Sequence, residues 1–116
     1  MTRMRLTIGV AVVGLALAGS ALAAPTATTV TVTAGKPSEL KFTLSKRSVP
    51  AGTVTFKVAN KGKTTHDFKI AGKKTKLLAA GKTATLRVTL KKGKAAFLCT
   101  VPGHAAAGMK GTLTVK

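Results

Sequence analysis

Three residues with metal-binding side chains lie close together near the carboxyl end of the chain. Cys99, His104 and Met109 occur in the segment FLCTVPGHAAAGMKG with the spacing Cys-x4-His-x4-Met, and Cys99 is the only cysteine. These spacings do not share one face of a helix. A strand that ends at Cys99 and continues into a tight loop can direct all three side chains to one point. The proline and the glycines of the segment favour such a loop.

The chemistry of these side chains indicates copper. A thiolate, an imidazole and a thioether form a soft set of ligands that suits this metal. A trigonal copper site needs a second imidazole, and the one other histidine is His66, in the segment HDF. Loops from distant strands meet at one end of a β-sandwich, so His66 can reach the loop 99–109. Taken singly, each of these residues is more often a core or surface side chain.

The elements that must position these residues have the two-residue periodicity of half-buried strands. Apolar and polar residues alternate at 28–34, 39–45, 53–60, 83–90 and 111–116, and HDFKIAG and AAFLC are two shorter candidates. Turn signals rich in glycine, proline and asparagine separate them. About seven short strands at this spacing predict an all-β fold, an antiparallel β-sandwich. Only residues 73–81 could hold a helical turn.

Residues 1–23 are predicted to be a secretory signal peptide. Arg3 and Arg5 precede an apolar run, and the run ends in a small-residue cleavage signal, ALA, at 21–23. The apolar run is short for a membrane span, which needs about 20 apolar residues, although a retained anchor is the alternative. Residues 24–116 would then be one domain without a membrane segment. That domain is expected in the periplasm or outside the cell.

The charge of the chain is strongly positive. Twenty lysines and arginines face two acidic residues, Glu39 and Asp67, and removing Arg3 and Arg5 from the formal charge of +18 leaves +16. Nucleic acid is disfavoured as a partner, because the chain is predicted to be exported and its lysines lack interleaved aromatic residues for base stacking. Most lysines are expected to form a solvated basic surface.

The segments HDF and CTVPGHAAAGM resemble the copper-binding signature of the cupredoxins, the small blue copper proteins. The resemblance covers residues 24–116 in length, strand number and motif order. It implies a Greek-key sandwich of about eight strands with one type 1 copper ion near one end. It also implies the ligand roles: His66 and His104 bind through ring nitrogens, Cys99 through its thiolate, and Met109 as a weak axial ligand.

Residues next to these ligands are expected to orient them. In cupredoxins the residue after the first histidine is usually asparagine, and its backbone N–H points at the thiolate. Here that residue is Asp67, which keeps the N–H, can accept a hydrogen bond from Thr100 and brings a negative charge near the copper. Val101 could offer the thiolate a second N–H, because the proline comes one position later. Aspartate in place of the usual asparagine is expected to affect the redox potential of the copper and not the fold.

The resemblance implies a one-electron carrier rather than an enzyme, with electrons passing through the exposed edge of His104. Small residues around this histidine would form an apolar patch for a redox partner with an acidic face, steered by the lysines. The patch consists of Pro102, Gly103, Ala105, Ala106 and Ala107. Copper storage, delivery or resistance is the alternative, because it uses the same ligands. A copper oxidase or nitrite reductase fragment would need further histidines. The protein is expected to be a monomer.

Overall fold

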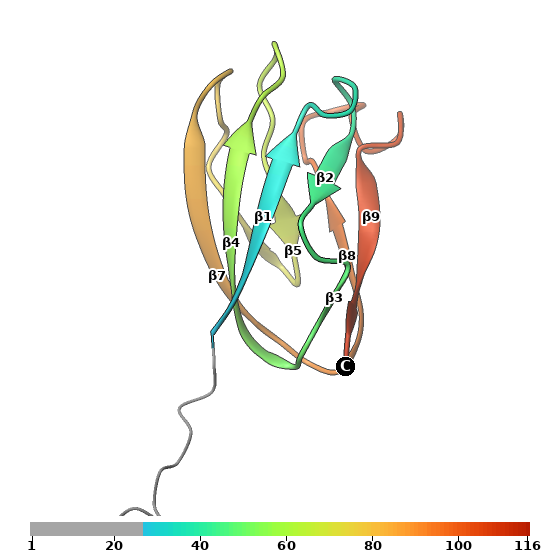
Figure 1. Ribbon diagram of the computed structural model, residues 1–116. Coiled ribbons are helices and arrows are strands. Elements are labelled where there is room, and N and C mark those ends of the chain that lie inside the picture. The colour runs from blue at the N-terminus through green and yellow to red at the C-terminus, as the bar shows by residue number, and fades with distance from the viewer. Residues whose placement is uncertain (1–26) are drawn as a thin grey trace, which may run out of the picture.

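The computed structural model describes residues 27–116, and the predicted signal peptide lies outside the described residues. Within residues 27–116 every regular element is a β-strand (Figure 1). The nine strands are β1 (Thr28–Ala34), β2 (Phe42–Leu44), β3 (Ser48–Val49), β4 (Gly52–Asn60), β5 (Lys69–Ile70), β6 (Lys73–Lys74), β7 (Thr83–Leu90), β8 (Gly93–Leu98) and β9 (Lys110–Val115). No helix in this part of the chain is long and apolar enough to cross a membrane.

The strands form two sheets, one with the order β2-β1-β4-β7 and the other with the order β3-β9-β8-β5-β6. This arrangement confirms the predicted all-β sandwich. Most pairs are antiparallel, but β1 pairs with β4 and β3 pairs with β9 in parallel, so both sheets are mixed. The chain passes to the other sheet between the two members of each parallel pair, and such a crossover returns a strand in the same direction.

The predicted strand positions agree closely with the structure. β1 and β7 have the predicted bounds, β4 begins one residue earlier, and β9 begins and ends one residue earlier. β2 is shorter than its alternating segment, β5 covers only two residues of the candidate HDFKIAG, and β8 begins two residues before the candidate AAFLC. β3 and β6 were not predicted, because two residues are too few to show a periodicity. The segment 73–81, which could have held a helical turn, contains β6 and then runs on without a helix.

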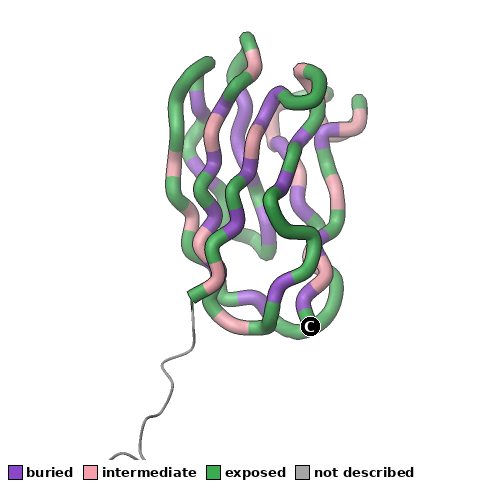
Figure 2. Tube along the Cα trace, in the orientation of Figure 1, coloured by how far each residue is buried: buried purple, intermediate pink, exposed green. Residues whose placement is uncertain are grey.

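The strand alternation places the core between the sheets (Figure 2). In β1 and β4, every second residue is buried, as the alternating colours along these strands show. Four phenylalanines occupy the centre, and the Phe68 ring lies 5.2–5.6 Å from the rings of Phe42, Phe56 and Phe97. Phe68 follows His66 by two positions and Phe97 precedes Cys99 by two. The aromatic core therefore fixes both segments that carry the predicted ligands.

Replacing Phe68 by alanine is expected to lower the free energy of unfolding of the metal-free protein by about 3–5 kcal/mol, because it leaves a cavity where three rings meet. Leu77, which is 61% exposed, provides the control: Leu77→Ala should change stability by less than about 0.5 kcal/mol. Urea unfolding of both variants measures the two values. Equal values would contradict the assignment of Phe68 to the centre of the core.

Candidate metal centre

His66 is held in a fixed position by backbone pairing. Its N–H donates to the Leu78 carbonyl at 3.1 Å, and the Leu78 N–H donates back to the His66 carbonyl at 2.8 Å. The buried side-chain amide of Asn60, at the end of β4, donates to the carbonyls of both Thr64 and Leu78 at 2.8 Å. These bonds tie the loop before His66 to the strand end and to the facing segment, so the imidazole enters the core in one orientation.

The second ligand segment is the loop between β8 and β9. The Cys99 N–H donates to the Met109 carbonyl at 3.1 Å, and the Met109 N–H donates to the His104 carbonyl at 3.0 Å. Gly103 and Gly108 have φ angles of +84° and +114°, values that favour glycine. The loop therefore closes on itself, and it lies at the end of the sandwich opposite the C-terminus, as does the loop after β4 (Figure 1).

Three of the four predicted ligands meet at one point. The ligand atoms of His66, Cys99 and His104 all lie within 4.8 Å of one another. The two histidine Nδ1 atoms are 3.2 Å apart, and the Cys99 Sγ atom is 3.9 Å from His66 Nδ1 and 3.6 Å from His104 Nδ1. Imidazole and thiolate ligands placed about 2.0–2.3 Å from one metal ion and about 120° apart would be separated by roughly 3.5–3.8 Å. The donor set thus fits a trigonal metal site.

Met109, the fourth predicted ligand, lies on the same loop as Cys99 and His104. Its side chain is fully buried, like those of His66 and Cys99, and its backbone is bonded to both Cys99 and His104. His104 differs from the other three because it is only partly buried. One imidazole of the cluster is therefore accessible from outside.

Burial raises the pKa of the Cys99 thiol above its usual 9.0, with backbone N–H groups of Asp67 and Val101 acting in the opposite direction. The negative charge of Asp67 raises the pKa further. The metal-free protein therefore holds a neutral thiol at pH 7. A metal ion that binds the thiolate must displace this proton.

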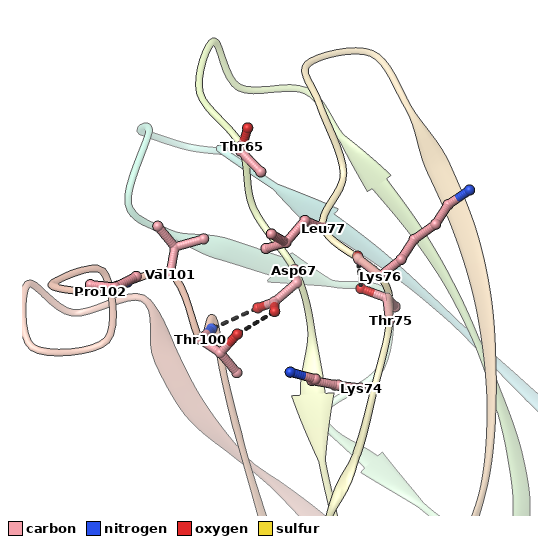
Figure 3. A pocket seen from close by; sticks show the side chains of 9 residues that line it. All are labelled: Thr65, Asp67, Lys74, Thr75, Lys76, Leu77, Thr100, Val101 and Pro102. Carbon is pink, nitrogen blue, oxygen red and sulfur yellow. Dashed lines mark hydrogen bonds between the residues drawn. The ribbon is translucent and has the colours of Figure 1, made fainter.

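Asp67 joins the two ligand segments. Its buried carboxylate accepts a hydrogen bond from the Thr100 N–H at 2.6 Å and another from the Thr100 hydroxyl. Figure 3 shows both bonds at the edge of a hollow, with the exposed Leu77 and the loop residues Val101 and Pro102 beside it. Because Asp67 follows His66 and Thr100 follows Cys99, these bonds hold the two buried ligands in register.

Two residues of the site were not predicted from the sequence. The Glu39 carboxylate accepts a hydrogen bond from His66 Nε2 at 2.9 Å, and this bond is the largest cause of the lowered pKa of Glu39. Asn60, described above, was expected only as the last residue of the strand 53–60 and the start of the turn that follows it. A signal for Glu39 was its isolation as one of two acidic residues among twenty bases. A signal for Asn60 was its place at the end of an apolar strand.

A family model for the cupredoxin-like domain matches residues 6–115. The chain therefore belongs to the cupredoxin-like family. The match includes part of the predicted signal peptide, which stays a prediction. The cupredoxin carries His66, Cys99, His104 and Met109 as a potential type 1 copper site.

Solved structures support the same relationship. The chain is 27% identical to auracyanin B, covering 78% of this chain and 89% of that one with a TM-score of 0.69. It is 25% identical to a dithionite-reduced auracyanin from the photosynthetic bacterium Roseiflexus castenholzii, covering 78% and 98% of the two chains with a TM-score of 0.67. It is also 25% identical to the copper protein rusticyanin, covering 76% of each chain with a TM-score of 0.67. No curated protein sequence matches the chain.

The residues of the predicted docking patch lie at the surface of the same loop. Four of them are exposed and Ala105 is half-buried beside the half-buried His104; the exposed four are Pro102, Gly103, Ala106 and Ala107. Their small side chains leave one edge of the cupredoxin site open.

In the metal-free cupredoxin, Cys99 is expected to react with iodoacetamide at least about tenfold more slowly than in the urea-unfolded chain at pH 8. The reason is that burial both shields the sulfur and raises its pKa, which lowers the thiolate fraction at any given pH. The reaction rate of the folded protein should therefore rise with a midpoint above pH 9.0. Mass spectrometry of quenched samples follows both reactions, and a midpoint at or below that of the unfolded chain would contradict the expectation.

Proposed function

We propose that this cupredoxin binds one copper ion through His66, Cys99, His104 and Met109 and carries single electrons between redox partners. The observation that carries the proposal is the convergence of two imidazoles and one thiol within 4.8 Å, with one imidazole partly exposed. Membership of the cupredoxin-like family and similarity to the copper protein rusticyanin support it. Bound copper would supply a one-electron couple between Cu(I) and Cu(II).

The protein would hold the copper ligands rigidly and away from solvent in both oxidation states. Backbone bonds fix His66 from one side, and the closed loop 99–109 fixes the other three ligands. The phenylalanine core lies directly beneath both segments. A site whose ligands move little suits both oxidation states, because little reorganisation is needed when an electron arrives or leaves.

His104 is the proposed exit for the electron. It is the one ligand that is partly exposed, and the small residues around it would let a partner approach closely. We propose that the cupredoxin is exported, acts as a monomer in the periplasm or outside the cell, and docks a redox partner with an acidic face. The exposed lysines near this end would steer that partner by long-range attraction.

Adding Cu(II) to the purified protein without residues 1–23 is expected to give an intense visible band from the thiolate-to-copper transition. Cys99→Ser should abolish the band, because a hydroxyl does not supply a thiolate. Absorption spectroscopy with a Cu(II) titration measures the band and its stoichiometry. Absence of the band in the unsubstituted protein would remove the proposed copper site.

Voltammetry of the same sample separates electron transfer from copper storage or delivery, which use the same four ligands. The proposed carrier should be reduced and reoxidised repeatedly without loss of copper. Release of the ion upon reduction would favour storage or delivery. Met109→Leu serves as a second variant, since loss of a weak axial bond should shift the potential while copper remains bound.

The positive charge of the chain predicts how small redox reagents react with the copper-loaded protein. Oxidation of the reduced, Cu(I)-loaded protein by the anion hexacyanoferrate(III) should slow steeply as salt is added, whereas its oxidation by the cation tris(phenanthroline)cobalt(III) should speed up. Stopped-flow measurements at several ionic strengths test this.

Charge reversal locates the steering surface. Lys74 and Lys76 line the hollow beside Asp67 at the site end, whereas Lys91 and Lys92 lie in the turn between β7 and β8 at the opposite end. The double variant K74E/K76E should slow hexacyanoferrate(III) reduction more than K91E/K92E, which has the same net charge. Equal rates for the two variants would contradict the proposal that Lys74 and Lys76 attract the anion to the site.

A further inference from the structure

Glu39 contacts a predicted ligand from a part of the chain that the copper motif does not include. It lies between β1 and β2, 27 positions before His66, and its Oε2 atom is 2.9 Å from His66 Nε2. The His66 side chain is completely buried, while that of Glu39 is 33% exposed. Among residues 27–116, this is the one close pairing of a basic and an acidic side chain. Glu39 therefore pairs with the histidine rather than with one of the many lysines.

The other oxygen of the Glu39 carboxylate is also occupied. Oε1 accepts hydrogen bonds from the backbone N–H groups of Lys63 at 2.6 Å and Thr64 at 3.1 Å. These N–H groups belong to the loop that leads into His66. The carboxylate is thus held at both ends, with one oxygen on the loop and the other on the imidazole, so its direction toward Nε2 does not depend on a free rotamer.

Two glycines leave the space that this carboxylate occupies. A Cβ atom at Gly62 would overlap Glu39 Oε2 and would lie 3.0 Å from His66 Nε2. A Cβ atom at Gly35, where φ is +86°, would overlap the backbone of Gly62 and lie 3.1 Å from the same Oε2. The close approach of the two loop backbones therefore requires glycine at both positions. The loops are shaped around the Glu39–His66 contact.

This contact decides which nitrogen of His66 carries the proton. A carboxylate only accepts hydrogen bonds, so in the neutral imidazole Nε2 must be the donor and Nδ1 keeps its lone pair. Nδ1 is the atom that faces Cys99 Sγ at 3.9 Å and His104 Nδ1 at 3.2 Å. The Thr64 hydroxyl, 3.4 Å from Nε2, can accept from the same N–H. The imidazole is therefore prepared to bind a metal through Nδ1 before any metal arrives.

We propose that Glu39 is a positioning residue of the metal centre, which holds His66 as the Nε2–H tautomer with Nδ1 directed at the copper and places a negative charge next to that ligand. This inference rests on the proposed function for its copper-dependent consequences. A carboxylate bonded to a ligand imidazole makes the imidazole a better electron donor, which stabilises Cu(II) over Cu(I). Glu39 thus strengthens Cu(II) binding and lowers the reduction potential.

The test compares Glu39→Gln and Glu39→Ala with Ser38→Lys. Glu39→Gln keeps the shape and one acceptor oxygen but removes the charge. Ser38→Lys makes the same change in net charge at the adjacent exposed position without altering the contact with His66. Folding of each variant is first checked by the dispersion of its amide NMR spectrum. Glu39→Gln carries the test alone if Glu39→Ala does not fold.

The first measurement needs no metal. Nitrogen-15 NMR of the histidine ring in the metal-free protein should show His66 as a single Nε2–H tautomer in the unsubstituted protein and in Ser38→Lys. In Glu39→Ala a mixture of tautomers is expected, and in Glu39→Gln a partial mixture, because the amide can also donate to Nε2. An unchanged single tautomer in every Glu39 variant that folds would overturn the positioning role.

The second measurement uses Cu(II) alone as the probe. Glu39→Gln should lose about ten- to hundredfold in Cu(II) affinity in a competition titration and should show a higher reduction potential, with Ser38→Lys much closer to the unsubstituted protein. Affinity and potential equal to those of Ser38→Lys would overturn the inference while leaving the copper site intact. If the unsubstituted protein binds no copper, the proposed function fails, and the tautomer measurement still decides the role of Glu39.

Discussion

The two hydrogen bonds from Thr100 to the Asp67 carboxylate connect the halves of the metal centre. One half belongs to the segment after β4, and the other is the loop between β8 and β9. Asp67 and Thr100, which connect them, are 33 positions apart in the sequence. A buried carboxylate is costly unless it is paired, so Asp67 and Thr100 must remain together. Because each stands next to a ligand, His66 and Cys99 are held in the same relation. The closed loop 99–109 and the phenylalanine core further restrain the two segments that the Asp67–Thr100 hydrogen bonds connect.

Both acidic residues of this protein lie at the candidate metal centre. The chain has only two, Glu39 and Asp67, against twenty bases, and both contact the metal centre on either side of His66. Glu39 bonds the outer nitrogen of the imidazole, and Asp67 bonds the loop that carries Cys99. Negative charge is thus gathered where a cation would bind. The exposed lysines lie on the outer surface, where we expect them to act on charged molecules at long range.

Burial differs among the four candidate ligands in a way that suits the proposed electron transfer. His66, Cys99 and Met109 are completely buried, and His104 is partly exposed among small residues. The buried core phenylalanines Phe68 and Phe97 pack against each other two positions from His66 and Cys99, while the loop residues next to His104 are small. A site built in this way would isolate a bound metal ion from solvent and leave one imidazole accessible from outside.

The amino-acid sequence determined the features that depend on local pattern. Alternating side chains specified the main strands, because one face of each strand must be buried. The spacing of Cys99, His104 and Met109 specified one loop as the source of three candidate ligands. The tertiary structure alone decided the parallel pairings, the two-residue strands and the contact of Glu39 with His66. Strand direction and side-chain partners across 27 residues arise when loops close over the core. The pattern of neighbouring residues does not predict how these loops pack. The contact of Glu39 with His66 depends on Gly35 and Gly62, which let the two loop backbones approach closely.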